Sequence, residues 1–123
     1  MLVEVKDARQ VPGEGFRRWF TDPDLDLIVW FADESQEQIE GFQFCYDKQR
    51  TEHALTWRPG RGLMHNKVDD GEHPYGAKRS PTLIADGSID LPRILRIFEE
   101  NAGRLEPRLV KYVGARLREA GGR

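Results

Sequence analysis

The pattern of apolar and polar residues changes about two thirds of the way along the chain. Up to residue 86, short runs rich in β-branched and aromatic residues, several alternating with a period of two, are separated by turn residues. Such runs are typical of β-strands, and we predict strands at residues 2–6, 16–20, 25–32, 41–46, 53–57, 63–68 and 82–85. Short connections such as Arg58-Pro59-Gly60-Arg61 indicate hairpins between successive strands.

From Asp90 onward the apolar period becomes that of a helix. Asp90 is suited to cap a first helix that ends near Gly103, and a second helix begins at Pro107. The apolar positions that define the two helices are Leu91, Ile94, Leu95 and Phe98, then Leu109, Val113 and Leu117. Strands followed by helices predict one α+β domain over residues 1–123: an antiparallel β meander of six to seven strands in residues 1–86, then two C-terminal helices in residues 90–120 packed on one face. Residues 69–81 show no period, and we expect a loop there.

Strand pairing assigns each side chain to one face of the predicted sheet, because side chains alternate along a strand. We expect Tyr46 to pair with His53, and Trp57 to pair with Gly62 across the turn. One face then collects most of the phenylalanines, and we predict that the helices cover it. Its members are Phe16, Phe20, Leu25, Leu27, Val29, Phe31, Phe42, Phe44, Tyr46, Leu55, Trp57, Met64 and Val68.

The opposite face, called the back face below, mixes apolar and polar residues. It is predicted to carry Arg17, Trp19, Asp26, Ile28, Trp30, Gln43, Cys45, Ala54, Thr56, Leu63, His65 and Lys67. Two tryptophans and an isoleucine are more apolar surface than a solvated antiparallel sheet usually exposes. We therefore expect the back face to be covered by a second copy of the chain, a ligand, another protein, or the N-terminal segment 1–15.

Composition narrows the class of protein. The 19 Lys and Arg against 21 Asp and Glu give a formal net charge of −2, which is not the strong field of a protein built mainly to bind nucleic acid or anionic lipid. Cys45 is the single cysteine, Glu4 and Lys6 interrupt any secretory signal, and no apolar run approaches the roughly 20 residues of a membrane helix. We expect a soluble, cytoplasmic protein without a membrane role.

Candidate chemistry is sparse. His53 and His65 are predicted to point to opposite faces and no HExxH or CxxC spacing occurs, so we expect neither a metal nor a cofactor. Cys45 would be a nucleophile if His65 or Arg17 lowered its pKa, although a free cysteine in a central strand is more often a small buried hydrophobe. A ligand-binding or enzymatic pocket on the back face would be lined by Arg17, Gln43, Cys45, Thr56 and His65.

Basic residues are concentrated in the second helix. Arg108, Lys111, Arg116 and Arg118 offer a surface for nucleic acid, while a solvated helix face is the simpler interpretation. Arg17 with Trp19 and Trp30 is a second arrangement that would stack bases.

Three runs carry a resemblance: residues 41–48 (Gly-Phe-Gln-Phe-Cys-Tyr-Asp-Lys), Ala54-Leu55-Thr56-Trp57 and Val68-Asp69-Asp70-Gly71. Together they resemble small bacterial proteins of uncharacterised function. The resemblance covers the central half of the chain and implies a bacterial cytoplasmic protein. It implies no activity, cofactor or catalytic residue.

These observations leave three hypotheses. The first is a non-enzymatic domain that forms a homodimer or binds another protein through the surface around Trp19, Ile28 and Trp30. The second is a small-ligand binder or enzyme with the back-face pocket described above. The third is a nucleic-acid-binding domain that uses its C-terminal helix.

Overall fold

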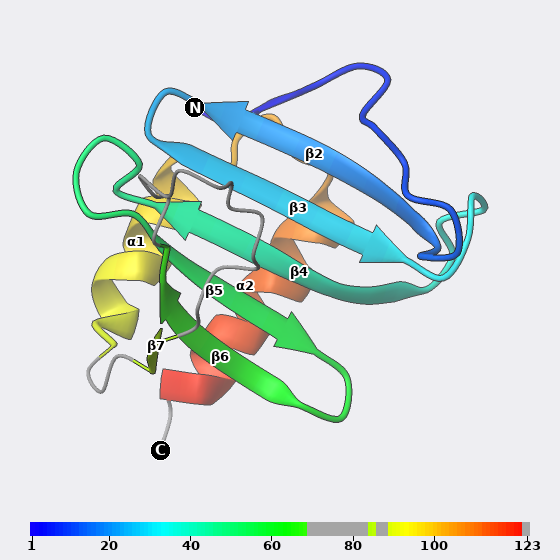
Figure 1. The fold of residues 1–123 in the computed structure, drawn as a ribbon. Coiled ribbons are helices and arrows are strands. Elements are labelled where there is room, and N and C mark those ends of the chain that lie inside the picture. The colour runs from blue at the N-terminus through cyan, green and yellow to red at the C-terminus, as the bar shows by residue number, and fades with distance from the viewer. Residues whose placement is uncertain (69–83, 86–88, 122–123) are drawn as a thin grey trace, which may run out of the picture.

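The fold is a single antiparallel sheet with two helices on one side (Figure 1). The computed structural model describes residues 1–68, 84–85 and 89–121. The strands are β1 (Val3–Glu4), β2 (Phe16–Asp22), β3 (Leu25–Phe31), β4 (Ile39–Tyr46), β5 (His53–Arg58), β6 (Gly62–Lys67) and β7 (Ile84–Ala85). Each strand pairs with the next in sequence, and the helices α1 (Leu91–Glu100) and α2 (Pro107–Gly121) follow. The α+β meander with C-terminal helices is thus confirmed, while the loop predicted at residues 69–81 lies outside the described residues.

The core lies between the sheet and the helices. Phe44, in the middle of the central strand β4, is fully buried, and its ring meets that of Phe98 from α1 edge to face at 5.7 Å. Leu2 is also fully buried, and its backbone N–H donates to the carbonyl of Asn101 just after α1. The remaining large buried side chains are Phe20, Leu25, Leu27, Val29, Phe31, Phe42, Tyr46, Leu55, Ile94, Leu105, Leu109, Val113 and Leu117. The phenylalanine-rich face is therefore the one that the helices cover, as predicted.

Both helices begin where the sequence signals predict, whereas α1 ends at Glu100, three residues before Gly103. The Asp90 carboxylate accepts a hydrogen bond from the backbone N–H of Arg93 and caps α1, whose first turn contains Pro92. The predicted apolar positions Ile94 and Phe98 face the sheet and are fully buried.

The register of the first hairpins keeps every side chain on its predicted face. Tyr46 pairs with His53 as expected, and Phe20 pairs with Leu27. Between β3 and β4 the register shifts after Trp30, which pairs with Gly41, whereas Phe31 pairs with Ile39. Glu40 is therefore the extra residue of a β-bulge at this end of the sheet.

The predicted register between β5 and β6 is wrong by one residue. Gly62 pairs with Arg58 instead of Trp57, because the connection has three residues rather than four. The Arg61 N–H donates to the Arg58 carbonyl to close a tight turn, and Gly62 continues with a φ of 75°, a geometry that three-residue hairpin loops use. The shift reverses every side chain of β6: Leu63, His65 and Lys67 lie on the helix-covered side and Met64 lies on the back face.

The N-terminal segment does not cover the back face. It runs along the outer edge of β2, as Figure 1 shows. The Val5 N–H donates to the carbonyl of Trp19, and the side chain of Gln10 hydrogen-bonds both backbone groups of Arg17. This removes segment 1–15 from the candidates for covering that face.

Candidate functional site

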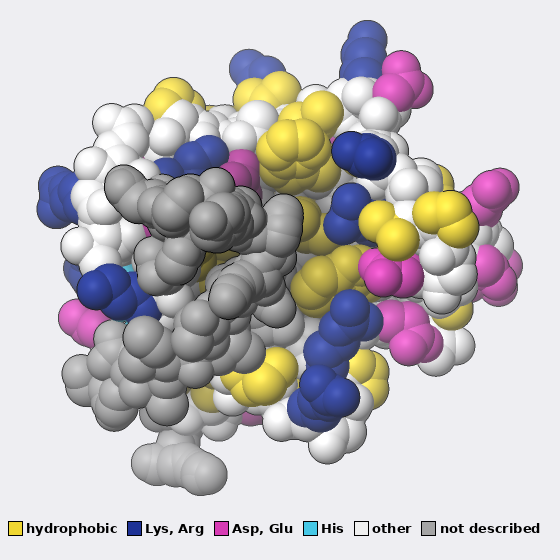
Figure 2. All heavy atoms as spheres, viewed as in Figure 1, with side chains coloured by type: hydrophobic (Ala, Val, Ile, Leu, Met, Phe, Trp, Pro, Cys, Tyr) yellow, Lys and Arg dark blue, Asp and Glu magenta, His cyan; other side chains and the backbone are white. Residues whose placement is uncertain are grey.

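The back face brings together seven of the eight residues that we predicted for a binding site. Arg17 lies opposite Trp30, Trp19 lies opposite Ile28, and Gln43 lies opposite Thr56, all within adjacent strand pairs. Cys45 also points to this face, beside Asp26. Figure 2 shows hydrophobic and basic side chains interspersed over the upper right part of this face, with Asp and Glu side chains at its right-hand rim.

Two valines extend this surface beyond the predicted residues. Val3 pairs with Thr21, and Val5 lies beside Trp19, so both valines share the side of Trp19. Val3 is 44% exposed and Trp19 is 38% exposed. The alternating residues 2–6 signalled a strand, but its place beside β2 could not be derived from turn lengths. We call Val3, Val5, Trp19, Ile28 and Trp30 the back-face strip.

Trp19 is held in place although it is exposed. Its indole Nε1–H donates to Asp26 Oδ1 at 3.2 Å. The same carboxylate oxygen accepts from the Thr21 hydroxyl at 2.6 Å and pairs with Lys48 Nζ at 3.1 Å. A large aromatic side chain with a fixed orientation loses little conformational entropy when a partner packs on it.

Trp30 is partly covered by a side chain of its own sheet. The guanidinium carbon of Arg58 lies 3.8 Å from the centroid of the Trp30 ring, in a cation–π stack. Arg58 passes over Gly41, where a Cβ would lie 3.1 Å from Arg58 Cδ. A shallow depression of about 540 Å³ adjoins the stack and is lined by Glu14, Gly15, Trp30, Phe31, Ala32, Glu40 and Arg58. The Arg58 guanidinium therefore covers part of the apolar surface that we expected Trp30 to expose.

The polar residues at the centre of the back face satisfy one another. Gln43 Nε2 donates to the Thr56 hydroxyl at 3.1 Å across β4 and β5. The guanidinium of Arg17 does not reach this pair and donates through Nε to the carbonyl of Arg9 at 2.9 Å. The predicted pocket residues therefore share a face without converging on one point.

Cys45 is not an activated nucleophile. Burial raises the pKa of its thiol to about 12, and the negative charges of Glu52 and Asp26 act in the same direction. His65, the base that we considered for it, lies on the other side of the sheet.

We expect Cys45 to react slowly with thiol reagents in the folded protein. A pKa raised by about three units from that of an ordinary thiol leaves about 1000-fold less thiolate at pH 8. Absorbance assays with dithionitrobenzoate should show modification about 1000-fold slower in native buffer than in guanidinium chloride. Equal rates in the two conditions would contradict the burial and the pKa of this thiol.

The two histidines that we predicted to point apart lie side by side. The rings of His53 and His65 are stacked, with centroids 5.0 Å apart and planes within 5°. His65 is buried, and its Nε2 is hydrogen-bonded to the Tyr46 hydroxyl at 2.6 Å. The one-residue shift of β6 is the cause, and it moves His65 from the predicted back-face pocket to the helix side. Among residues 1–68, 84–85 and 89–121, no group of three or more His, Cys, Asp and Glu side chains could hold a metal ion.

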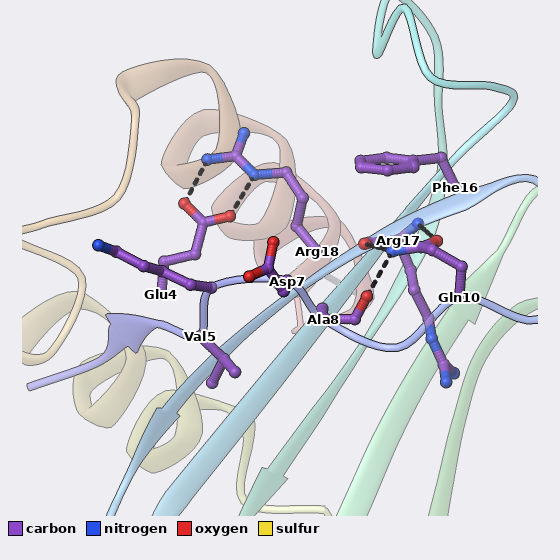
Figure 3. Close-up of a pocket in the computed structure, with 9 residues that line it drawn as sticks. Glu4, Val5, Asp7, Ala8, Gln10, Phe16, Arg17 and Arg18 are labelled. Atoms are coloured by element: carbon purple, nitrogen blue, oxygen red, sulfur yellow. Dashed lines mark hydrogen bonds and ion pairs between the residues drawn. The ribbon is translucent and has the colours of Figure 1, made fainter.

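A groove of about 670 Å³ follows the outer edge of β2 (Figure 3). It is lined by Glu4, Val5, Lys6, Asp7, Ala8, Gln10, Phe16, Arg17 and Arg18. On its helix side, Arg18 binds both oxygens of Glu4 at 2.8 Å and one oxygen of Glu106 at 2.9 Å. The hydrogen bonds from Arg18 lower the pKa of the Glu4 carboxyl, so this acid is ionised and engaged. No sequence signal pointed to this groove.

Most of the basic side chains that we predicted to bind nucleic acid on α2 already contact other groups of the protein. Arg108 donates to the Gln36 carbonyl and lies over the Phe31 ring at 5.7 Å. Arg116 stacks on Trp57 of β5 at 5.0 Å and pairs with Glu119 at 3.1 Å. Arg118 pairs with Glu99, whereas Lys111 is exposed. Three of the four predicted nucleic-acid contacts thus hold elements of the fold together.

Comparison with known proteins adds no further constraint. No protein family, curated protein or solved structure matches the chain. Neither α1 nor α2, the helices of the described part of the chain, is long and apolar enough to cross a membrane.

Proposed function

We propose that this protein is a non-enzymatic binding domain that associates with a second copy of itself through the back-face strip. The observation that carries this proposal is Trp19, a large aromatic side chain that is 38% exposed and yet fixed by its hydrogen bond to Asp26. Tryptophan and arginine dominate the binding energy of protein interfaces, and both occur here on a rigid sheet.

The shape of the strip supports a protein partner better than a small ligand. Val5, the residue after β1, lies beside Trp19 of β2, and Trp19 lies beside Ile28 of β3, so the three side chains form a row across the sheet. A row on a sheet face offers contact over a broad area, whereas small ligands are usually held in concave pockets. The Gln43–Thr56 pair and the protonated Cys45 thiol offer little to a reaction.

The charges around the strip support self-association. Arg17 and Arg58 lie beside Trp30, and Glu14 and Glu40 line the depression next to the same ring. A two-fold axis close to Trp30 would bring Arg17 and Arg58 of one copy near Glu14 and Glu40 of the other. Such complementarity within one surface favours a homodimer over a partner of one charge sign.

The setting that we propose is the cytoplasm of a bacterium. It is supported by the resemblance of the central runs to small bacterial proteins and by the presence of a single cysteine, Cys45.

Trp19→Arg is the variant that tests this proposal. We expect the native protein to be dimeric at about 100 µM. The dimer dissociation constant of the variant should be about 30-fold to 1000-fold higher, because the loss of a hot-spot tryptophan costs about 2–4 kcal/mol of binding free energy. Sedimentation velocity over a concentration series measures the change.

Lys111→Glu is the matched control, since it reverses a charge on the exposed side of α2, across the core from the strip, and should leave the dimer intact. Far-UV circular dichroism checks the fold of both variants. A native protein that stays monomeric at about 200 µM would overturn self-association.

A further inference from the structure

The outer edge of β2 is only partly paired with a strand. Val3 and Glu4 of β1 pair with Thr21 and Phe20, and the Val5 N–H donates to the carbonyl of Trp19 at 2.9 Å. Arg17 is the next residue toward the start of β2 whose backbone groups face this edge, because such residues occur at every second position. No strand residue lies beside Arg17 among the described residues.

The side chain of Gln10 takes the place of that strand residue. Its Oε1 accepts from the Arg17 backbone N–H at 2.9 Å, and its Nε2 donates to the Arg17 carbonyl at 2.9 Å. A residue of an antiparallel neighbour would make the same two hydrogen bonds with its own backbone N–H and carbonyl. The Gln10 amide therefore imitates one peptide unit at a sheet edge.

The chain leaves room beside this edge. Asp7 has a φ of 56°, where the N-terminal segment turns after its contact with β2. The groove of about 670 Å³ follows, with Gln10 and Arg17 in its lining. Figure 3 shows Val5 and Arg17 directed to one side of β2, and Glu4 and Arg18 directed to the other.

We propose that this edge binds an extended acidic peptide segment of another protein by β-strand addition. The peptide displaces the Gln10 amide from Arg17 and lies in the groove as a further strand beside β2. The exchange keeps the number of backbone hydrogen bonds at Arg17 unchanged, so the side chains of the peptide decide the affinity. This proposal concerns the edge of the sheet and does not depend on the dimer proposed for its face.

Charge selects the kind of peptide. Lys6 and Arg17 line the groove and outnumber Asp7, its one other acid, because the carboxylate of Glu4 is already paired with Arg18. The peptide residue opposite Arg17 points to the same side as the Arg17 side chain, so an acidic residue there meets the guanidinium. A second copy of β2 is a poor occupant, because antiparallel pairing centred on Arg17 would oppose two arginines.

The probe for this site is a fluorescein-labelled peptide of sequence Val-Glu-Val-Glu-Val-Glu, titrated with the full chain in fluorescence anisotropy. We expect binding with a Kd below about 1 mM, and at least tenfold weaker binding of the matched Val-Lys-Val-Lys-Val-Lys peptide. N-methylation of the glutamate amides should abolish binding, because those N–H groups face β2 when glutamate lies opposite Arg17. N-methylation of the valine amides, which face away from β2, should leave binding unchanged.

Two variants locate the site. Gln10→Ala removes the intramolecular competitor and should tighten binding about tenfold, which corresponds to the loss of about 1.4 kcal/mol of hydrogen bonding. Arg17→Glu should reverse the preference, so that the lysine peptide binds more tightly than the glutamate peptide.

Three results would overturn the proposal: equal binding of the two peptides to the native protein, loss of binding on valine N-methylation, or an affinity that responds to neither variant. The proposal would also be overturned if the glutamate peptide did not bind at 1 mM native protein while circular dichroism showed that the protein was folded.

Discussion

Replacing Phe44 by alanine is expected to lower the free energy of unfolding by about 4 kcal/mol, within the range of about 3–5 kcal/mol for phenylalanine truncation in a core. Phe44 is fully buried in the central strand, and its ring contacts Phe98 edge to face and Tyr46 in a stack at 6.3 Å. Its neighbours across the sheet are Leu27 and Leu55, both fully buried as well. Because the sheet and α1 both contribute to the cavity wall, little collapse can fill the space. Urea denaturation followed by circular dichroism measures the loss.

The matched control is Gln43→Ala in the same strand. Gln43 points to the back face and hydrogen-bonds Thr56, so its truncation should cost about 1 kcal/mol. A domain of this size has about 5–15 kcal/mol of stability, which makes the difference between the two variants easy to resolve. Similar losses for both variants would contradict the assignment of the two faces of β4.

Gly41→Ala is expected to lower the free energy of unfolding by about 3 kcal/mol, by adding backbone strain to steric overlap. Gly41 has a φ of 131°, where an L side chain is strained. The new Cβ would overlap with the carbonyl oxygen of Trp57 and crowd the Arg58 side chain at 3.1 Å. Relief would require β4 and β5 to separate, and it would push Arg58 off the Trp30 ring. Chemical denaturation measures the loss, and the indole resonance of Trp30 in NMR spectra reports the change at the stack.

Gly60→Ala separates the two causes. Gly60 also has a positive φ, 84°, but nothing lies within 4 Å of a Cβ built there. Its replacement therefore carries the backbone strain alone, about 1 kcal/mol. If the two alanine variants were equally stable, the close approach of β4 and β5 at Gly41 would be refuted.

The architecture could be predicted because local signals agreed with one another. Turn residues separate the strands, the spacing of Ile94 and Phe98 marks α1, and Asp90 caps it. The pairing of Tyr46 with His53 followed from closing the loop at residues 47–52, and alternation supported it because a shift by one residue would have scattered the phenylalanines between two faces. Face assignments were therefore correct wherever large apolar residues marked the core.

The assignment failed in β6, where that marker is weak. The two possible registers of residues 62–67 each place one large apolar residue on the helix side, either Leu63 or Met64. The hydrophobic pattern therefore does not distinguish between these registers. The choice rests on a turn in which Gly62 takes a φ of 75° and shortens the loop to three residues. His65 was misplaced as a result, and with it the partner that we had considered for Cys45.

The groove and the Arg58 stack depend on the reach of long side chains. Gln10 bonds a backbone seven residues away, and Arg58 crosses Gly41 to reach Trp30 on a strand that is not its neighbour. Neither interaction leaves a periodic signal, since both depend on rotamers that are set only when strands are already side by side. Contacts of this kind can be identified only from the folded structure, not from the sequence pattern.

The simple order of the sheet also has a consequence for how the chain becomes folded. Because each strand from β2 to β6 pairs with its neighbour in sequence across a connection of at most seven residues, these hairpins can assemble early, one after another. The aromatic side of that sheet stays in contact with water until α1 and α2 dock on it. A nascent or proteolysed chain that stops before Leu91 therefore exposes Phe42 and Phe44, and an exposed apolar surface of this kind promotes aggregation.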